Sequence, residues 1–383
     1  SYVFLNGART TKMTDKGLSH SYINVCGGVF TNTCFKEGTK DTNGGLDTTP
    51  IGSCDLDVNL VKGDFAWASA LHCNGNNAST QVRFNFAGGR LVTRYLRRMN
   101  AYGRIDLYWN GGIYRPTLDK STLKGQTTSL SAGSDWTSNV CSTNGANFEI
   151  PAGNVFTLDQ ALTHDADLAD AADGGLASVG EGTLVLGVAN SFTGPVKALA
   201  GTIRVDADGA IPAGSPLVIG GGAVDLNGHA LTFGDVLFCN GAWPVTGGEV
   251  TVGGRILAAS GVAGASIPMG TGVIFAPGAL FRPQIGYDPQ TGRWSSDFLS
   301  FAGGATGLVT VDLGHDAENP LPKGFQVKIA EFPSGTASFP RFKIVNWGDE
   351  RRTDAVVKFV TAESGVIEVW VRITGVGAVL IVR

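Results

Sequence analysis

Carboxylates close to basic residues are the first side chains in this sequence that suggest acid–base chemistry. Two short-spaced pairs stand out, Asp55 with Asp57, and Asp206 with Asp208 shortly after Arg204. Stacked on one face of a sheet, such carboxylates can cleave a polysaccharide. Asp206 and Asp208, however, flank an alanine directly before a glycine, where the chain is expected to turn. We therefore interpret this second pair as turn carboxylates.

Asp225 and His229 form a second apparent dyad. Asn227 and Gly228 lie between them and are the residues that a sharp corner requires, so we expect Asp225 and His229 to serve that corner. The sequence contains no G-x-S-x-G, P-loop or zinc-protease motif. We predict no catalytic residue, no cofactor and no enzymatic activity, and a polysaccharide lyase or hydrolase is the least favoured alternative.

The segment 164–175, HDADLADAADGG, is the one stretch whose composition suggests a metal ion. Carboxylates at short spacing can converge on Ca²⁺. The spacing is not that of an EF-hand, because Asp is missing at the fifth position and Gly at the sixth. We interpret the stretch as a solvated acidic turn and predict no metal site, with calcium binding as the alternative.

Basic and aromatic residues alternate between positions 90 and 114, a pattern that suggests nucleic acid or an acidic glycan as a ligand. They are Arg90, Arg94, Tyr95, Arg97, Arg98, Tyr102, Arg104, Tyr108, Trp109 and Tyr114. The alternative is that these side chains only cover the outer face of a sheet. Only 3 Met and 16% charged residues fit a secreted β protein better than a cytosolic helical one, so we predict no nucleic-acid partner. A surface glycan held by exposed Trp109 and Tyr114 is the alternative partner.

The cysteine content predicts disulfides. The six are Cys26, Cys34, Cys54, Cys73, Cys141 and Cys239. An even number in a chain with export character favours disulfides over free thiols or metal ligands, and no two have C-x-x-C spacing. Fifteen pairings are open. Cys34, Cys54 and Cys73 follow one another at nearly equal intervals, each close to the length of one solenoid coil, so neighbours are candidates to stack on successive coils.

The elements that must position all these residues are short strands, clearest between Gly180 and Asp235. Apolar residues alternate with polar ones over three or four positions, and each run ends in Gly, Asn or Asp. This pattern is typical of strands buried on one face. The inward residues are expected to be Leu184, Leu186, Ile203, Val205, Leu217, Ile219, Val224, Leu226, Leu231 and Phe233. Strands this short can bury that face only by stacking on similar strands.

The same stretch resembles the autotransporter-associated β-strand repeat, also called the passenger-associated transport repeat. The family pattern is roughly GxGTLxLxGxNxYTG, then AGTLxV, then LDLNGHxL. The matching residues are Gly180, Gly182, Thr183, Leu184, Leu186, Asn190, Phe192, Thr193, Gly194, Gly201, Thr202, Ile203, Val205, Asp225, Leu226, Asn227, Gly228, His229 and Leu231. Phe192 replaces the usual Tyr, Ile203 replaces Leu, and Pro195 stands where a second Gly is common. The match covers about one seventh of the chain. It implies a right-handed parallel β-solenoid exported from a bacterium, with structural motif residues and no enzymatic activity.

Composition and pattern together predict an all-β fold, a right-handed parallel β-solenoid with an irregular disulfide-containing N-terminal part and a β-rich C-terminal end. Gly supplies 55 of 383 residues without a triplet repeat, and 43% of residues are hydrophobic, which excludes collagen and disorder. We expect irregular coils with loop insertions over 1–150, regular coils over 151–300, and longer strands with a possible sandwich-like end over 301–383.

Both ends of the chain read as uncapped strands. The assembly candidates are Tyr2, Val3, Phe4 and Leu5 at the start, and Val379, Leu380, Ile381 and Val382 at the end. No run reaches the ~18 apolar residues of a membrane-spanning helix, and we predict no membrane span. Residues 1–150 hold 15 Lys and Arg against 11 Asp and Glu, whereas residues 151–383 hold 14 against 22. We expect an extracellular structural protein of a bacterial surface that assembles head-to-tail with itself. The first alternative is a surface adhesin or glycan-binding passenger.

Overall fold

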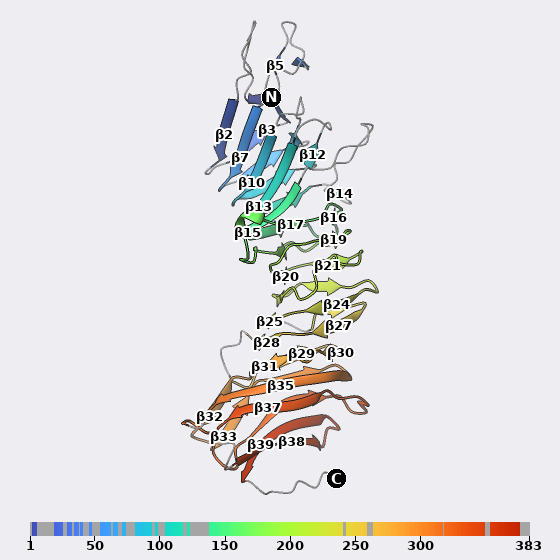
Figure 1. Cartoon of the computed structure of the whole chain (residues 1–383). Coiled ribbons are helices and arrows are strands. Elements are labelled where there is room, and N and C mark those ends of the chain that lie inside the picture. Colours follow the sequence, from blue (N-terminus) through green and yellow to red (C-terminus); the bar gives the residue numbers. More distant parts are fainter. Residues whose placement is uncertain are drawn as a thin grey trace. The chain divides into compact units, whose positions relative to one another are not determined.

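The structure is a computed structural model, and it describes residues 138–239, 243–258, 263–316, 318–348 and 353–375 (Figure 1). Before residue 138 it describes residues 2–5, 19–25, 29–32, 34–37, 39–40, 46–47, 54–62, 64–67, 71–73, 81–93, 96–98, 104–117 and 121–122. The chain divides into two compact units, Ser1–Pro212 and Ala213–Arg383. The expected boundaries at residues 150 and 300 fall inside these units.

The first unit is built from parallel ladders, in which each strand pairs with a strand one coil away. A coil here means one pass of the chain between a strand and its parallel partner. The main ladder is β2 (Ser19–Val25), β7 (Cys54–Leu60), β10 (Gln81–Phe86), β13 (Arg104–Pro116), β15 (Ser138–Phe148), β18 (Leu176–Ser178) and β20 (Val196–Ala198). Joined to it are β3 (Val29–Asn32), β8 (Asp64–Trp67), β11 (Arg90–Thr93) and β17 (Thr163–His164).

A second parallel ladder of the first unit contains β14 (Ser121–Thr122), β16 (Val155–Leu158), β19 (Thr183–Leu186) and β21 (Thr202–Val205). Smaller sheets pair β1 (Tyr2–Leu5) with β4 (Cys34–Glu37), and β9 (Leu71–Cys73) with β12 (Leu96–Arg98), both in parallel. β5 (Thr39–Lys40) and β6 (Leu46–Asp47) pair antiparallel. A single 3-10 helix, η1 (Ala166–Leu168), is the one helical element of the described residues.

The second unit contains ladders of the same kind. One consists of β22 (Leu217–Ile219), β25 (Val236–Phe238), β28 (Arg255–Ala258), β31 (Leu280–Phe281), β35 (Ala305–His315) and β37 (Arg341–Trp347). Another consists of β24 (Ala230–Phe233), β27 (Glu249–Val252) and β30 (Val273–Phe275), and it also reaches β35. β23 (Ala223–Asp225) pairs with β26 (Val245–Thr246).

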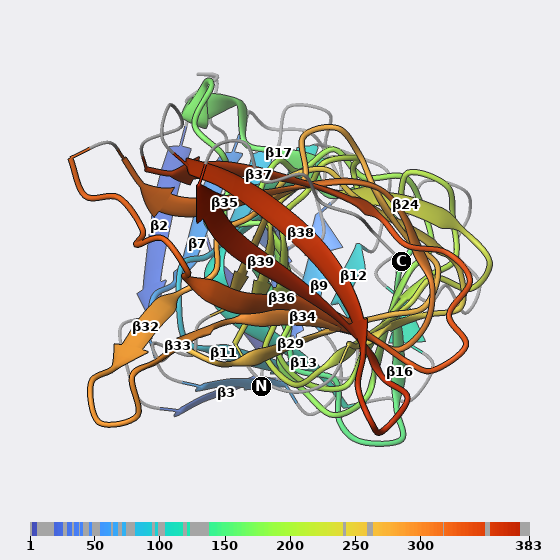
Figure 2. The same ribbon diagram turned by 90° about the horizontal axis from the view of Figure 1, so that it is seen from below.

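A five-stranded mixed sheet ends the described part of the second unit, and Figure 2 shows its strands side by side. β29 (Ser266–Met269), β34 (Phe298–Phe301) and β36 (Gln326–Phe332) are parallel. β39 (Ile367–Gly375) lies antiparallel between β36 and β38 (Thr353–Thr361). β32 (Ile285–Asp288) and β33 (Arg293–Ser296) form a separate antiparallel hairpin.

The predicted all-β class and parallel pairing are confirmed. The register repeats at the same short interval in both units, because Thr183 pairs with Thr202 and Ala230 pairs with Glu249, and the two pairs are equally far apart in the sequence. A chain that returns to its own previous strand at a regular interval is compatible with a β-solenoid.

The inward residues of the alternating stretch are buried as predicted. Leu184, Ile203, Leu217 and Phe233 are each fully shielded from solvent. Val185 alternates with Leu184 and Leu186, so the pattern predicts it on the outer face, yet only 2% of its surface is exposed. Its register partners are Thr157 and Arg204, whose side chains flank it on that face.

Stacked aromatic rings fill the core where coils meet. In the first unit the Trp109 ring lies 4.8 Å from that of Phe86 and 5.2 Å from that of Phe148. In the second unit the Phe301 and Phe332 rings lie 4.4 Å apart and nearly parallel. Such pairs add to the stability gained from burial alone, so these rings hold successive coils in register.

Gly201 shows why the repeat pattern requires glycine at a coil boundary. Its φ is +59°, in the left-handed region that side-chain-bearing residues avoid. A Cβ atom built there would lie 2.3 Å from the Gly180 carbonyl oxygen. The motif glycines therefore allow one coil to approach the next.

Candidate functional site

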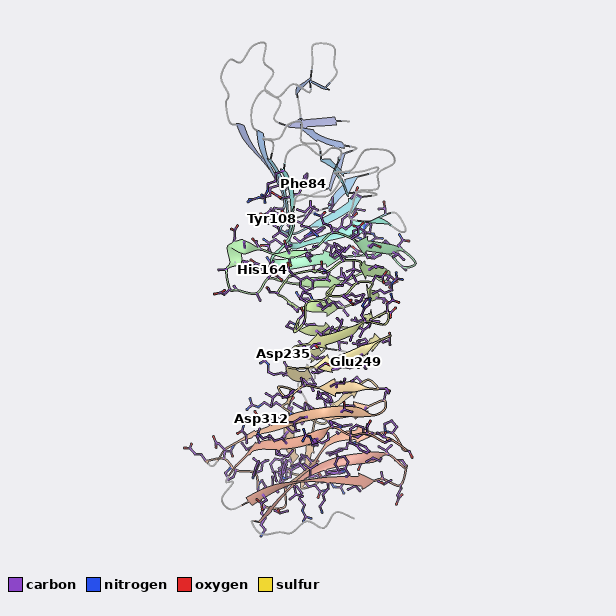
Figure 3. All side chains as sticks on the ribbon, turned by 45° about the vertical axis from the view of Figure 1, so that its right-hand side comes forward. Phe84, Tyr108, His164, Asp235, Glu249 and Asp312 are labelled. Atoms are coloured by element: carbon purple, nitrogen blue, oxygen red, sulfur yellow. The ribbon has the colours of Figure 1, made fainter. Side chains whose placement is uncertain are left out.

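A group of polar side chains in the described part of the first unit surrounds the buried carboxylate of Asp173, and we call it the Asp173 network. Asp173 precedes β18, and only 4% of its surface is exposed. The backbone N–H groups of Gly175, Thr193 and Gly194 donate to its two carboxylate oxygens at 2.9, 2.8 and 2.9 Å. His164, at the end of β17, places Nδ1 2.9 Å from Asp173 Oδ2 (Figure 3 marks His164). Cys141 Sγ lies 3.4 Å from Asp173 Oδ1.

The electrostatics of the Asp173 network follow from these contacts. Burial by itself raises the pKa of Asp173, but the hydrogen bonds from Thr193, His164 and the two glycines outweigh it and leave that pKa lowered. The hydrogen bond that His164 donates to the Asp173 carboxylate raises the pKa of His164. Burial, together with the Asp173 charge, raises the pKa of the Cys141 thiol.

These shifts decide what chemistry the Asp173 network can support. A nucleophilic cysteine must be a thiolate, whereas Cys141 is fully buried and its raised pKa keeps it protonated. The carboxylate is saturated by backbone donors from two neighbouring coils. The arrangement is suited to fastening the loop after β17 to the coil that follows.

The acidic turn 164–175 was predicted to hold no metal. Among the described residues, no group of three or more His, Cys, Asp or Glu side chains is placed to hold a metal ion. Asp165 instead caps η1, accepting a hydrogen bond from the Asp167 N–H at 3.2 Å. His164 and Asp173 at the two ends of the turn bind each other, a contact that sequence reasoning missed.

The corner role predicted for Asp225 is confirmed. Its Oδ1 accepts the Asn227 backbone N–H at 3.0 Å, and Asn227 and Gly228 both have positive φ, 47° and 90°. Asp206 forms an exposed ion pair with Arg204 at 2.7 Å. Asp55 and Asp57 lie in β7, but their side chains are outside the described part of the structure.

The interpretation of Trp109 and Tyr114 as exposed glycan-binding aromatics is wrong. Their exposed fractions are 0% and 1%, because β13 directs both rings into the aromatic stack. The Trp109 indole N–H donates to the Asn139 side chain inside the core. A ligand cannot reach either ring without unfolding this part of the sheet.

The described arginine side chains in and next to this segment pair with carboxylates of the same unit. Arg90 and Arg115 both donate to Glu149 at 2.8 Å. Arg104 forms an ion pair with the buried carboxylate of Asp106 at 2.6 Å. Arg94, Tyr95, Arg97, Arg98 and Tyr102 fall outside the described side chains. The basic and aromatic pattern therefore reflects sheet packing in the residues that the structure describes.

Two of the six predicted disulfide cysteines have described side chains, and both are free cysteines. Cys141 is buried and Cys239 is exposed, so the predicted disulfides are not confirmed for these two. Cys34, Cys54 and Cys73 lie in β4, β7 and β9, and their register partners are Tyr2, Ser19 and Arg98. Their side chains, and Cys26 altogether, lie outside the described part of the structure.

The assembly candidates are only partly placed. Tyr2–Leu5 forms β1, paired in parallel with β4. Val379, Leu380, Ile381 and Val382 lie outside the described residues. The terminal strands that the structure does describe in the second unit are β37 and β38, each the last strand of its sheet. β38 carries Phe359 and Val360, which are 46% and 44% exposed.

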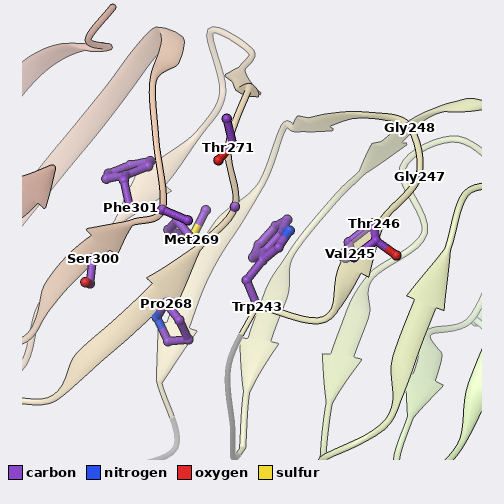
Figure 4. Close-up of a pocket in the computed structure, with 12 residues that line it drawn as sticks. Trp243, Val245, Thr246, Gly247, Gly248, Pro268, Met269, Thr271, Ser300 and Phe301 are labelled. Carbon is purple, nitrogen blue, oxygen red and sulfur yellow. The ribbon is translucent and has the colours of Figure 1, made fainter. Parts of the chain in front are cut away.

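A pocket of ≈ 610 Å³ opens in the second unit, and sequence reasoning did not find it (Figure 4). Its walls come from the segment entering β26, from the ends of β29 and β34, and from the turns after them. The lining residues are Trp243, Val245, Thr246, Gly247, Gly248, Pro268, Met269, Gly270, Thr271, Ser300, Phe301 and Ala302. No motif connects these segments, and only the ladder register brings them together.

In the described part of the chain, no helix has the length and apolar character that crossing a membrane requires. Comparison with protein-family models, curated proteins and solved structures found no match to this chain.

Proposed function

We propose that this chain is a structural protein of a bacterial cell surface, exported from the cell, that assembles head-to-tail with copies of itself. The proposal includes a right-handed β-solenoid of the autotransporter-associated repeat type. The motif residues from Gly180 to Leu231 support the relationship to that repeat. The parallel ladders, whose strands pair at a regular interval along the chain, support the solenoid fold. A chain of this kind acts through its ends and its surface rather than through a catalytic centre.

The observation that carries the proposal is the edge of β38, along which no further strand of the described residues pairs. β38 pairs with β39 along its whole length, from Thr353 to Thr361, and it is the last strand of its sheet. An edge strand presents unpaired backbone N–H and C=O groups to any strand that comes alongside. Soluble proteins usually protect such an edge, yet Phe359 and Val360 on β38 are nearly half exposed. A second copy adding a strand there would satisfy the backbone and cover both side chains.

Backbone pairing, rather than net charge, is the expected driving force. The acidic excess lies within residues 151–300, which hold 13 Asp and Glu against 5 Lys and Arg. Residues 301–383 hold nine of each. The end that contains β38 is therefore neutral, and its attraction to the basic segment 1–150 is weak. Assembly should accordingly depend little on salt.

Electron microscopy of the purified chain at high concentration tests the proposal. We expect ordered polymers from the unaltered chain and none from Val360→Lys, which places a charge on the β38 edge. The matched control is Leu199→Lys, at another exposed apolar residue (39% exposed) that is in the first unit and outside the strands. Monomers alone at every concentration, or polymers that Val360→Lys leaves intact, would overturn the proposal.

A further inference from the structure

We propose that the pocket around Trp243, which we call the Trp243 pocket, binds a neutral saccharide. The inference is independent of self-assembly, since the pocket lies at β26, β29 and β34 and includes no residue of β38. It replaces the binding role that the sequence suggested for Trp109 and Tyr114, whose burial excludes them.

The first argument is the aromatic wall. In Figure 4 the Trp243 ring stands between Thr246 on one side and Met269 and Phe301 on the other. The ring is held in place, because it packs at 5.9 Å against the Phe238 ring and lies tightly against Gly270. A Cβ at Gly270 would come within 2.4 Å of Trp243 Nε1. A flat apolar surface that is fixed before binding loses little conformational freedom when a ligand arrives.

The second argument is the kind of polar group present. Three hydroxyls line the pocket, on Thr246, Thr271 and Ser300. Ser300 donates its proton to Glu331 at 2.7 Å, so this hydroxyl can offer a ligand only its remaining acceptor capacity. The threonine hydroxyls are exposed and can both donate and accept. Hydroxyls beside an aromatic ring complement a sugar, which has hydroxyls at its rim and C–H groups on its faces.

The third argument is the absence of charge. None of the twelve lining residues is Asp, Glu, Lys, Arg or His. A charged ligand would lose its hydration there without meeting an opposite charge, which is costly. Glu331, which accepts the Ser300 hydroxyl, is itself paired with Lys328 at 2.9 Å. The lining therefore favours uncharged sugars over nucleotides and uronic acids. The volume of ≈ 610 Å³ lies in the range typical of small-molecule pockets, and it suits the end of an oligosaccharide.

Calorimetric titration of the full chain with chitotetraose, cellotetraose and maltotetraose tests the inference, with a heparin tetrasaccharide as the charged comparison. We expect at least one neutral oligosaccharide to bind and the heparin fragment not to bind. Trp243→Ala should weaken that binding by about tenfold or more, the change that corresponds to losing one good contact. Tyr287→Ala is the matched control, because Tyr287 is an aromatic residue with 51% exposure outside the pocket.

Two further variants keep the test independent of folding. Trp243→Phe retains a ring at the wall, and Thr271→Val removes one hydroxyl at nearly constant volume; both should weaken binding less than Trp243→Ala does. The far-ultraviolet circular dichroism of each variant should match that of the unaltered chain. No binding of any of the three neutral oligosaccharides at millimolar concentration would overturn the inference. The inference would also be overturned if the Trp243→Phe and Thr271→Val variants bound the oligosaccharide as tightly as the unaltered chain does. Binding of the heparin fragment more tightly than any neutral oligosaccharide would overturn it as well.

Discussion

Replacing Asp173 with alanine should strongly destabilise the first unit. The carboxylate accepts three backbone N–H groups, from Gly175, Thr193 and Gly194, at 2.8 to 2.9 Å, and its side chain has no exposed surface. Alanine leaves all three donors without their acceptor. Each buried donor without a partner costs ~1–3 kcal/mol, and water entering the vacated space recovers part of that. We therefore expect a loss of about 3–5 kcal/mol in the free energy of unfolding.

Urea unfolding followed by circular dichroism measures the loss in the free energy of unfolding. Amide hydrogen exchange shows which part of the unit is destabilised. Exchange should accelerate at the N–H groups of Gly175, Thr193 and Gly194 more than elsewhere in the unit. Asp206→Ala is the matched control, because Asp206 is also paired, but with Arg204 at the surface, where both side chains are 30% or more exposed. Removing an exposed ion pair costs no more than about 1 kcal/mol.

The comparison of the two alanine variants is decisive. Surface substitutions usually change the free energy of unfolding by up to about 0.5 kcal/mol. If the free energies of unfolding of Asp173→Ala and Asp206→Ala differ by no more than this, the Asp173 network does not fasten the coils. Unchanged exchange at the three amides would lead to the same conclusion even if the global stability fell. The free energy of unfolding of Asp173→Asn should lie between those of Asp173→Ala and Asp206→Ala. Asparagine keeps one acceptor oxygen but turns an amide group toward donors.

Four further predictions concern the first unit and the two free cysteines. The raised pKa of His164 contributes stability that is complete below the ordinary histidine value of about 6.5 and is lost as pH rises through the raised pKa; His164→Gln should remove this alkaline loss in unfolding measurements. The lowered pKa of Asp173 acts in the opposite direction, so its contribution is lost as pH falls through the lowered value. Iodoacetamide should label exposed Cys239 in the folded protein and buried Cys141 only after unfolding, as peptide mass mapping would show. Gly201→Ala should lower the melting temperature, because φ is +59° and the new Cβ would meet a carbonyl oxygen of the neighbouring coil.

The regular stretch was the part of the fold that sequence could predict. Alternation with a period of two assigns Leu184, Ile203 and Phe233 to one face, and that face must be buried somewhere. Return of the same pattern at a short interval then predicts parallel stacking. Val185 departed from the pattern because the sequence does not show which side chains of adjacent coils will flank it.

The sites were harder to predict because they depend on register across irregular coils. Asp106 pairs with Ser138 and Ala146 pairs with Leu176, and both separations along the chain exceed the one between Thr183 and Thr202. Without a constant interval, no pattern in the sequence shows that Trp109 points inward. The contact between Asp173 and Thr193 could have been found from the sequence, because their separation along the chain is close to that of one regular coil.

Nothing comparable connects the residues of the Trp243 pocket. Trp243, Thr271 and Ser300 belong to no shared motif, and they meet only because the segment that enters β26 lies beside the ends of β29 and β34. A pocket of this kind is set by the register of the ladders, so it could be found only in the structure.

The polar residues of the repeat motif show where function should not be sought. Asn190 accepts the Leu162 N–H at 2.8 Å and donates to the Ala210 carbonyl at 2.6 Å, so one side chain serves the coils before and after its own. Thr193 donates its backbone N–H to Asp173 in the same manner. Loops between short strands leave backbone groups that the ladders cannot pair, and each such group must find a partner. Motif residues that are already committed in this way have no capacity left for a ligand. The two surfaces proposed for recognition, the β38 edge and the Trp243 pocket, both lie outside the motif.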